Sequence, residues 1–314
     1  LLPTAALANL GMTANARNLE WAITKMLSHP LREVRQIGEE LKQVAMEETP
    51  TLVKYGEANP YLMKTREALT TCTRVQVGPC ARSLEKEPLT LIDYDEEAEE
   101  RLVAALLYQF SRLPFAELLE HTRKMPPEEK EEIIDQALNR LGPHDRPLRE
   151  LEHIYYTFDC LVDQGAYRDL SRHRMMTQTA QRPTVDYGYA IPRAIEEAGL
   201  RQDYQEAIDR ATSAHREIYQ RYPDEAAYLV TNAHNRRFLM TLNLRELYHL
   251  VSLRSRAEGH FSYRRIALAM FELAKERHPL LLRYLPFKEE PPSSAALEGE
   301  YFASLREGVG ALKR

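Results

Sequence analysis

Three side chains that can carry a positive charge stand in a row at Arg172, His173 and Arg174. An arginine fork can bind phosphate or carbonyl oxygens through two parallel hydrogen bonds, and a neighbouring histidine can donate a hydrogen bond to a heterocycle. Consecutive side chains point in different directions, so at most two of the three can converge on one ligand. Taken alone, the cluster fits either an anion-binding site or a solvated turn whose charges pair with nearby aspartates.

Two further groups of polar residues flank this cluster. Upstream, His144 and the pair Glu152–His153 lead into an alternating apolar run that begins at Ile154. Downstream, four residues spaced i, i+4, i+7 and i+11 would share one side of a helix, with Arg245 and His249 on a neighbouring side. Those four residues are Asn243, Leu247, Leu250 and Arg254. The pattern suits a helix that lines a cofactor cavity, although an ordinary surface helix gives the same spacing.

Composition limits the classes of partner. The chain has 314 residues, enough for one large domain or two of ordinary size. Its formal net charge of -5 gives no overall attraction to nucleic acid, so we expect no nucleic-acid partner and a local anion site. The apolar stretches are too short to span a bilayer, and no secretory signal is visible, so we expect no membrane partner and a cytoplasmic location. The chain opens at Leu1-Leu2-Pro3-Thr4 without a methionine, from which we expect a fragment or a processed chain.

The number and spacing of the cysteines argue against disulfide bonds and structural metal sites. The chain has three, Cys72, Cys80 and Cys160, and no two of them form a Cys-x-x-Cys pair. An odd number without that spacing argues against a disulfide framework and against structural zinc. We therefore expect reduced thiols and no metal site.

Hydrophobic periodicity predicts a mostly helical α+β fold with a small central sheet. Alternation predicts a strand over 154–161 and shorter strands over 74–77 and 87–92. Residues 288–300, rich in Glu, Pro and Ser, are expected to be loose before a last short helix. Helical spacing and end signals predict helices over 32–48, around 102–110, from 126 to Gly142, and over about 203–221, 242–255 and 262–278.

An internal repeat shapes the expected domain organisation. Segment 33–55 aligns with 262–284 at a constant offset of 229 residues, and Asn15-x-Arg17-x-Leu19 aligns with Asn243-x-Arg245-x-Leu247 at an offset of 228. Two blocks in the same order predict a tandem duplication. We expect four segments: the C-terminal part of a first module at 1–60, a linker at 61–88, a second, complete module at 89–287 and a tail at 288–314.

Together, these groups of residues resemble the flavin-dependent thymidylate synthases (ThyX). That family is marked by an Arg-His-Arg-x-x-Ser-x-Asn-Glu-x-Ser-x-Arg-Tyr motif, by a His and a Glu-His before it, and by an Asn-x-Arg helix with a Leu-Arg after it. Arg172-His173-Arg174 stands at the start of the motif, and His173 follows His153 by twenty residues. The resemblance implies FAD held between the subunits of a tetramer, with Arg254 at the nucleotide. It implies cofactor contacts from His144, Glu152, Arg172, His173, Arg174, Asn243, Arg245 and His249.

The sequence departs from the family pattern directly after the Arg-His-Arg start. Ala180, Arg182 and Thr184 stand where the family has Glu, its second Ser and Arg. Asp169 replaces a Gln that contacts dUMP, and Ala227 replaces an Arg that reaches the phosphate. Losing charge-assisted hydrogen bonds to a phosphate predicts that dUMP is not bound in the family's manner.

The sequence is compatible with two functions. The first is a ThyX-like flavoenzyme with FAD as cofactor, NADPH as reductant and a small-molecule nucleotide or folate substrate; in the family a methylene group passes from methylenetetrahydrofolate to dUMP. The second is a catalytically inactive flavin-binding or scaffold protein. No catalytic residue is assigned under either. Sites shared between subunits predict a homo-oligomer.

Overall fold

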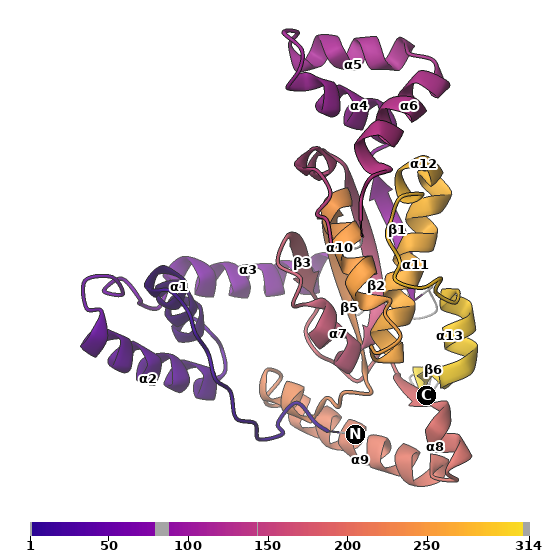
Figure 1. The fold of residues 1–314 in the computed structure, drawn as a ribbon. Coiled ribbons are helices and arrows are strands. Elements are labelled where there is room, and N and C mark those ends of the chain that lie inside the picture. The colour runs from indigo at the N-terminus through magenta and orange to yellow at the C-terminus, as the bar shows by residue number, and fades with distance from the viewer. Residues whose placement is uncertain (1, 79–87, 143, 310–314) are drawn as a thin grey trace. The chain divides into compact units, whose positions relative to one another are not determined.

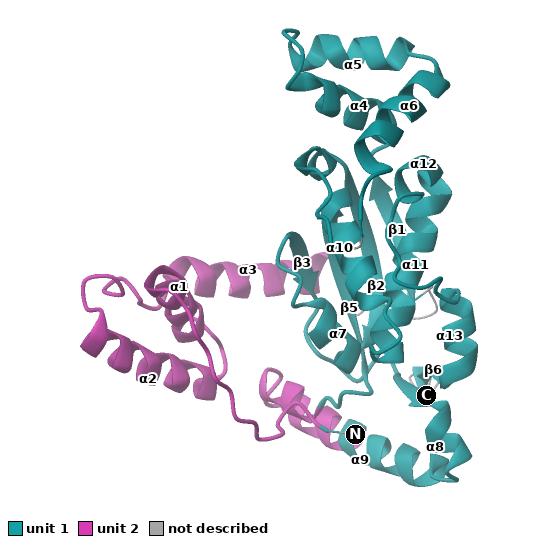
Figure 2. Cartoon of the chain, in the orientation of Figure 1, with its two compact units in different colours: residues 1–2, 86–212, 230–314 teal, residues 3–85, 213–229 magenta. Residues whose placement is uncertain are grey.

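The computed structural model describes residues 2–78, 88–142 and 144–309. The chain divides into two compact units (Figure 2). Unit 1 comprises residues 1–2, 86–212 and 230–314, and unit 2 comprises residues 3–85 and 213–229. Cys80 lies outside the described residues, whereas Cys72 and Cys160 are free thiols, exposed and buried respectively.

The centre of unit 1 is an antiparallel sheet with strand order β1-β2-β5-β3. The strands are β1 (Leu89–Tyr94), β2 (Tyr155–Asp163), β5 (Asn235–Asn243) and β3 (Met176–Ala180). Because side chains alternate along a strand, one face of the sheet collects the apolar residues. Tyr156 and Phe158 of β2 are fully buried on that face, opposite Leu242 and Met240 of β5.

Helices cover this apolar face. They are α7 (Gln164–Leu170), α10 (Leu244–Arg254), α11 (Phe261–Arg277) and α12 (Pro279–Leu282). Helix α11 packs on β1 and β2, α10 packs on β5, and the two helices contact each other (Figure 1). The sheet and the helices share one hydrophobic core. Helix α10 begins directly after the last residue of β5, with no connecting loop.

The remaining elements of unit 1 surround this layer. Three helices and a 3-10 turn precede β2: α4 (Ala98–Tyr108), α5 (Phe115–Lys124), α6 (Pro127–Leu138) and η1 (Arg149–His153). A second antiparallel pair joins β4 (Tyr189–Pro192) to β6 (Phe302–Glu307). Near this pair in the sequence are α8 (Arg193–Glu197) and α13 (Ser294–Tyr301).

Unit 2 is built from helices. Its own helices are α1 (Ala16–Leu27), α2 (Arg32–Glu48) and α3 (Pro60–Gln76), followed by η2 (Glu225–Leu229). Helix α9 (Arg201–Tyr219) contributes its last residues to this unit. The α1–α2 pair has a small hydrophobic cluster centred on Ile23, Ala45 and Val53.

Most of the predicted elements are confirmed, and so is the α+β class. The helix predicted over 32–48 is α2 with the same limits, and the strand predicted at 154–161 is β2. The strand predicted at 87–92 is β1, and the predicted helices beyond residue 98 correspond to α4, α6, α9, α10 and α11. The helix predicted over 242–255 starts two residues later than expected, because Leu242 and Asn243 still belong to β5.

Three local predictions differ from the structure. Residues 74–76 end helix α3 instead of forming a strand, because Asn59 caps that helix and Pro60 occupies its first position. Val75 and Val77 are exposed, so no apolar strand face exists there. The segment 288–300 is also less loose than expected, since Ser293 caps α13 and Leu297 of that helix is buried. Strand β6 follows α13, where a last short helix was predicted.

Among the described residues, no helix combines the length and the apolar character that crossing a bilayer requires.

Candidate cofactor site

A cavity of about 770 Å³ lies along α10 in unit 1. Three stretches of chain and Met175 form its wall: the stretches are residues 144–152, residues 243–256 of α10 and its ends, and residues 286–288 after α12. Five of the residues predicted from sequence line it together, from two of those stretches. These are His144, Glu152, Asn243, Arg245 and His249.

Asn243 sets the direction of the helix that carries most of this wall. It is the last residue of β5 and the N-cap of α10, and its side-chain oxygen accepts a hydrogen bond from the backbone N–H of Glu246 at 2.8 Å. The helix therefore starts at a fixed register on the sheet edge. Positions 245, 249 and 252 then fall close together on the helix surface, on the cavity side.

Arg245 is held in place by the chain that precedes β2. Its Nη1 lies 3.0 Å from a carboxylate oxygen of Glu152, and its Nε donates to the carbonyl of Pro147 at 2.8 Å. Arg149 binds the same carboxylate through two contacts of 3.0 Å. The hydrogen bond from Arg149, with a smaller contribution from Arg245, lowers the pKa of the Glu152 carboxyl. Glu152 is thus an ionised anchor that orients Arg245 at the cavity wall.

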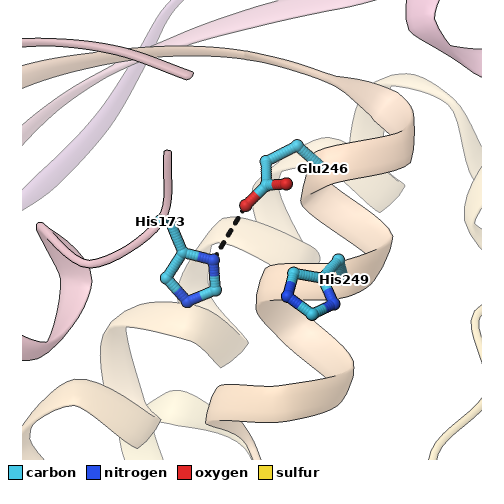
Figure 3. Close-up of side chains that lie close together, drawn as sticks. All are labelled: His173, Glu246 and His249. Atoms are coloured by element: carbon cyan, nitrogen blue, oxygen red, sulfur yellow. Dashed lines mark hydrogen bonds and ion pairs between the residues drawn. The ribbon is translucent and has the colours of Figure 1, made fainter. Parts of the chain in front are cut away.

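His173 lies inside the protein (Figure 3). Its Nδ1 is 2.8 Å from a carboxylate oxygen of the buried Glu246, and its Nε2 is 3.1 Å from Nε of Arg254. An arginine N–H can only donate, so Nε2 must accept and the ring proton must sit on Nδ1, where it donates to Glu246. Both ring nitrogens are therefore committed to partners within the fold.

The neighbours of His173 point elsewhere. Arg172 and Arg174 are exposed, and Arg172 pairs with the Asp169 carboxylate at 3.3 Å. Among the described residues of this segment, Met175 lines the cavity and residues 172–174 do not. The tripeptide thus divides into one inward histidine and two outward arginines.

Arg254, which the resemblance assigns to the nucleotide, contacts Asp169, which replaces a nucleotide-binding Gln of the family. An Nη of Arg254 donates to the Asp169 carbonyl at 2.9 Å, and the other Nη lies 3.7 Å from the Asp169 carboxylate. The guanidinium also lies 5.2 Å from the Tyr263 ring centroid. Arg254 is largely covered, and its hydrogen bonds stay within the fold.

The other residues at which the sequence differs from the family pattern lie in different surroundings. Ala180 ends β3, and the Thr184 hydroxyl donates to the Asp186 carboxylate at 2.8 Å. Arg182 is exposed. Ala227 lies in η2, in unit 2.

A metal does not fit the cluster around His173. One ligand atom each from His173, Glu246 and His249 lie within 4.8 Å of one another. Metal binding at Nδ1 would need that nitrogen's lone pair and a proton on Nε2, which would then face the N–H of Arg254. The guanidinium of Arg254, whose Nε lies 3.1 Å from Nε2 of His173, would also repel a nearby cation. The two ring nitrogens of His173 are accounted for by hydrogen bonds to Glu246 and Arg254, and we assign no metal to the group.

Several wall residues escaped the sequence reasoning. Glu246 could have been noticed, because a carboxylate at the third position of a helix beside a basic cluster is a candidate for burial against a histidine. Phe287 and Lys288 carried no such signal, since their segment has the composition of a loop. Arg146 and Arg256 also line the cavity and add positive charge.

One family model matches more than half of the chain. The profile described as "Thymidylate synthase complementing protein" (Thy1) matches residues 90–280. A UPF0159 protein of Chlamydia muridarum is 34% identical over 296 residues, covering 91% of this chain and 56% of that protein. The chain thus spans little more than half the length of this relative, and the same holds for a UPF0159 protein of Thermoplasma acidophilum, 29% identical and 58% covered.

More distant similarities involve proteins with a described activity. A flavin-dependent thymidylate synthase of Sulfurisphaera tokodaii is 32% identical over 151 residues, which are 43% of this chain and 56% of that protein. The solved structure of ThyX from Helicobacter pylori, complexed with FAD and dUMP, is 17% identical with a TM-score of 0.47. That similarity covers 64% of this chain and 100% of the other.

Proposed function

We propose that this chain, which belongs to the thymidylate synthase complementing protein (Thy1) family, binds FAD in the cavity along α10 and acts as a flavoprotein with an altered nucleotide site. The carrying observation is that one cavity collects His144, Glu152, Asn243, Arg245 and His249. These are five of the eight residues that the resemblance to the flavin-dependent thymidylate synthases assigns to the cofactor.

The wall suits a flavin dinucleotide in size and charge. Cofactor sites are clefts of about 300–1,000 Å³ with a mostly apolar lining and a few placed polar groups, and this cavity has about 770 Å³. Arg245, Arg256 and Lys288 bring positive charge that complements a diphosphate. Phe287 and Leu253 supply apolar surface for a flat ring.

Flavin, when bound, supplies the redox chemistry, and the protein supplies placement and charge. Arg245 offers guanidinium donors from a position fixed by Glu152 and Pro147. His249, exposed on the cavity side of α10, can donate to or accept from the cofactor. The outward side chains of Arg172 and Arg174 are available to a cofactor that reaches a neighbouring copy, which supports a homo-oligomeric assembly.

The substrate differs from that of the thymidylate synthases in this proposal. Arg254, the one nucleotide-binding residue retained from the family pattern, already bonds to His173 and Asp169. A carboxylate at 169 repels a phosphate, and Ala180 and Thr184 bring no positive charge. We infer a different small-molecule nucleotide or folate as substrate, with NADPH as reductant. The commitment of Arg254 within the fold also supports the alternative of a catalytically inactive flavin-binding scaffold.

A titration tests the cofactor proposal. FAD added to the purified chain is expected to bind, with a change in flavin fluorescence that saturates. Arg245→Met removes a cation from the wall and should weaken FAD binding at least about tenfold, or about 1.4 kcal/mol. The matched control is Arg149→Met, which removes the other partner of Glu152 from outside the cavity wall and should change the affinity less than about threefold.

Three results would decide against parts of the proposal. If the chain takes up no FAD, the flavin proposal is wrong. Equal losses of FAD affinity in the two arginine variants would show that FAD does not bind in the assigned cavity. Calorimetric binding of dUMP to the FAD-loaded chain would contradict the altered nucleotide site. Anaerobic bleaching of bound flavin by NADPH supports the enzyme, whereas its absence supports the scaffold.

A further inference from the structure

Two helix pairs at distant places in the chain are built alike. Helices α1 and α2 contact each other, as do α10 and α11. Asn15 caps α1 by accepting from the N–H three residues ahead at 2.9 Å, and Asn243 caps α10 in the same way at 2.8 Å. The first helices begin at Ala16 and Leu244, which repeats the sequence offset of 228 residues.

The second helices agree even more closely. Helix α2 spans 32–48 and α11 spans 261–277, so both ends differ by the sequence offset of 229. Each ends in a residue of similar backbone geometry: Thr49 has φ -140° and ψ 56°, and His278 has φ -131° and ψ 68°. A proline follows each of them in the sequence. Shared caps, lengths and ends support a common origin of the two pairs.

Burial separates the two pairs. Ile37 is 44% exposed, whereas its counterpart Ile266 is 1% exposed. Leu52 is 59% exposed, whereas its counterpart Leu281 is 0% exposed. The same side of the structure is thus open in the first pair and covered in the second. Tyr55 is 71% exposed as well, and we call these three exposed positions, Ile37, Leu52 and Tyr55, the open α1–α2 face.

In the second pair a sheet supplies the cover. Helix α11 packs on β1 and β2, and Ile266 and Leu281 share a core with Tyr156 and Phe158 of β2. Among the described elements of unit 2, the first pair has extensive contacts only between its own two helices. A cluster as small as that around Ile23 leaves a helix pair marginally stable in water.

We propose that the open α1–α2 face packs against the apolar face of an antiparallel sheet in a first Thy1-type module, carried by the same, longer polypeptide. Residues 1–60 are then the C-terminal part of that module, 61–88 the linker and 89–287 the second module. The partner surface has the character of β2 and β5: alternating aromatic and aliphatic side chains on the face of a twisted sheet. The length of the relatives supports this occupant, since the matched region fills little more than half of them.

A second copy of this chain does not offer the required surface. Its own sheet carries α10 and α11 on the apolar face, and residues such as Tyr156 and Met240 there are already fully buried. The occupant must therefore be a sheet whose apolar face still lacks this helix pair. A first module that ends in α1–α2 has that property.

Cysteine labelling compares this chain with the longer Chlamydia muridarum relative, whose match over 91% of this chain takes in both residues 37 and 266. In this chain, with Cys72 and Cys80 changed to serine, Ile37→Cys should react quickly with a maleimide and the matched control Ile266→Cys slowly. In the intact relative, cysteines at both aligned positions should react slowly, with at least a tenfold drop at the first. Hydrogen exchange on the unsubstituted proteins gives the same comparison for α2 and α11 and covers the case in which a variant does not fold.

The outcomes divide cleanly. Slow labelling and slow exchange at the α2 position only in the relative support the proposal. Equal rates in the two proteins overturn it. Labelling at position 37 that slows as this chain is concentrated would show that a second copy covers the face, which also overturns it. The result of this comparison does not depend on whether the chain binds FAD.

Discussion

Glu246 contributes to this fold through a contact that sequence spacing does not reveal. It lies on α10 three residues after the cap, is buried, and accepts a hydrogen bond from His173, 73 residues away in the chain. A buried carboxylate is tolerated only with such partners, because its desolvation is costly. The His173–Glu246 contact therefore ties the loop after α7 to the helix that lines the cavity.

Replacing Glu246 tests this link. Glu246→Ala leaves the Nδ1–H of His173 buried without an acceptor and should lower the free energy of unfolding by about 1.5–3 kcal/mol, the range for hydrogen bonds to charged groups. Glu246→Gln keeps an acceptor oxygen and should cost less. Urea unfolding measures both. Glu276→Ala, on the exposed side of α11, is the control and should stay within about 0.5 kcal/mol of the wild type. A loss no larger than that control would refute the role of Glu246.

His278 gives stability a dependence on pH. It is buried, and its Nδ1 lies 2.8 Å from the Tyr156 hydroxyl. Burial lowers the pKa of His278 below its ordinary value of 6.5, against a smaller raising effect from Asp95. The folded state thus binds fewer protons than the unfolded state in that range. The contribution of His278 is complete above about pH 6.5 and is lost as the pH falls through the lower folded-state pKa.

The corresponding measurement compares urea midpoints at pH 7.5 and 5.5. The wild type should lose more stability over this interval than His278→Gln, which cannot take up the proton. His29 has a pKa lowered in the same direction by burial, and it remains in both proteins, so the comparison isolates His278. An identical pH slope in the two proteins would count against this assignment.

At the scale of elements, the helices α2 and α11 were the most predictable part of the chain. The stripe of apolar residues in 32–48 and the proline after it placed α2 with its correct limits, and the same signals placed α11. Strand β5 was missed. Phe238, Met240 and Leu242 alternate, but Leu239 between them is apolar and partly exposed, which breaks the pattern. The burial of Phe238 and Met240 depends on the helices that cover the sheet, and these are distant in the sequence.

The candidate site was also predictable only in part. Residues 243, 245 and 249 follow from helix geometry once α10 is recognised. Phe287 and Lys288 could not be predicted, because only the folding of the chain after α12 brings them back along α10. His173 was assigned to the ligand, yet both its ring nitrogens bond to Glu246 and Arg254, a pairing between elements that spacing within one segment cannot show.

Gly38 offers a test of how closely α1 and α2 pack. A Cβ added there would lie 2.8 Å from the Cβ of Met26 and 3.3 Å from the backbone nitrogen of Leu27. Gly38→Ala should therefore separate the two helices and destabilise the pair, although alanine favours a helix by about 1 kcal/mol. The control Gly299→Ala lies in α13 with open space around it and should be neutral or stabilising. Hydrogen exchange in α2 and α13 gives both readouts, and faster exchange in α13 alone would contradict the prediction.

At the scale of the whole molecule, the described cavity and the first of the two similar helix pairs, α1–α2, belong to different units. All residues that line the cavity are part of unit 1, whereas α1 and α2 are part of unit 2. Binding stabilises the structure that forms the site. The two units should therefore respond differently to the cofactor.

Hydrogen exchange with and without FAD tests this separation. At a free concentration of one hundred times the dissociation constant, FAD should stabilise unit 1 by about 2.7 kcal/mol. Exchange in α10, β5 and η1 should slow, while exchange in α1 and α2 should not change. Equal protection of both units would show that the cofactor site extends beyond unit 1. Removing FAD by dialysis should restore the original rates.

The division of Arg172-His173-Arg174 into inward and outward side chains also affects how substitutions at these positions would be tolerated. His173 is constrained by folding, because any replacement must satisfy both Glu246 and Arg254 in a closed space. Arg172 and Arg174 are exposed, so the stability of the monomer constrains them little. A library screened for soluble expression should be depleted of variants at 173 and permissive at 172 and 174. The same library screened for flavin retention should become restrictive at all three positions if the proposed flavin contacts place a second requirement on this motif.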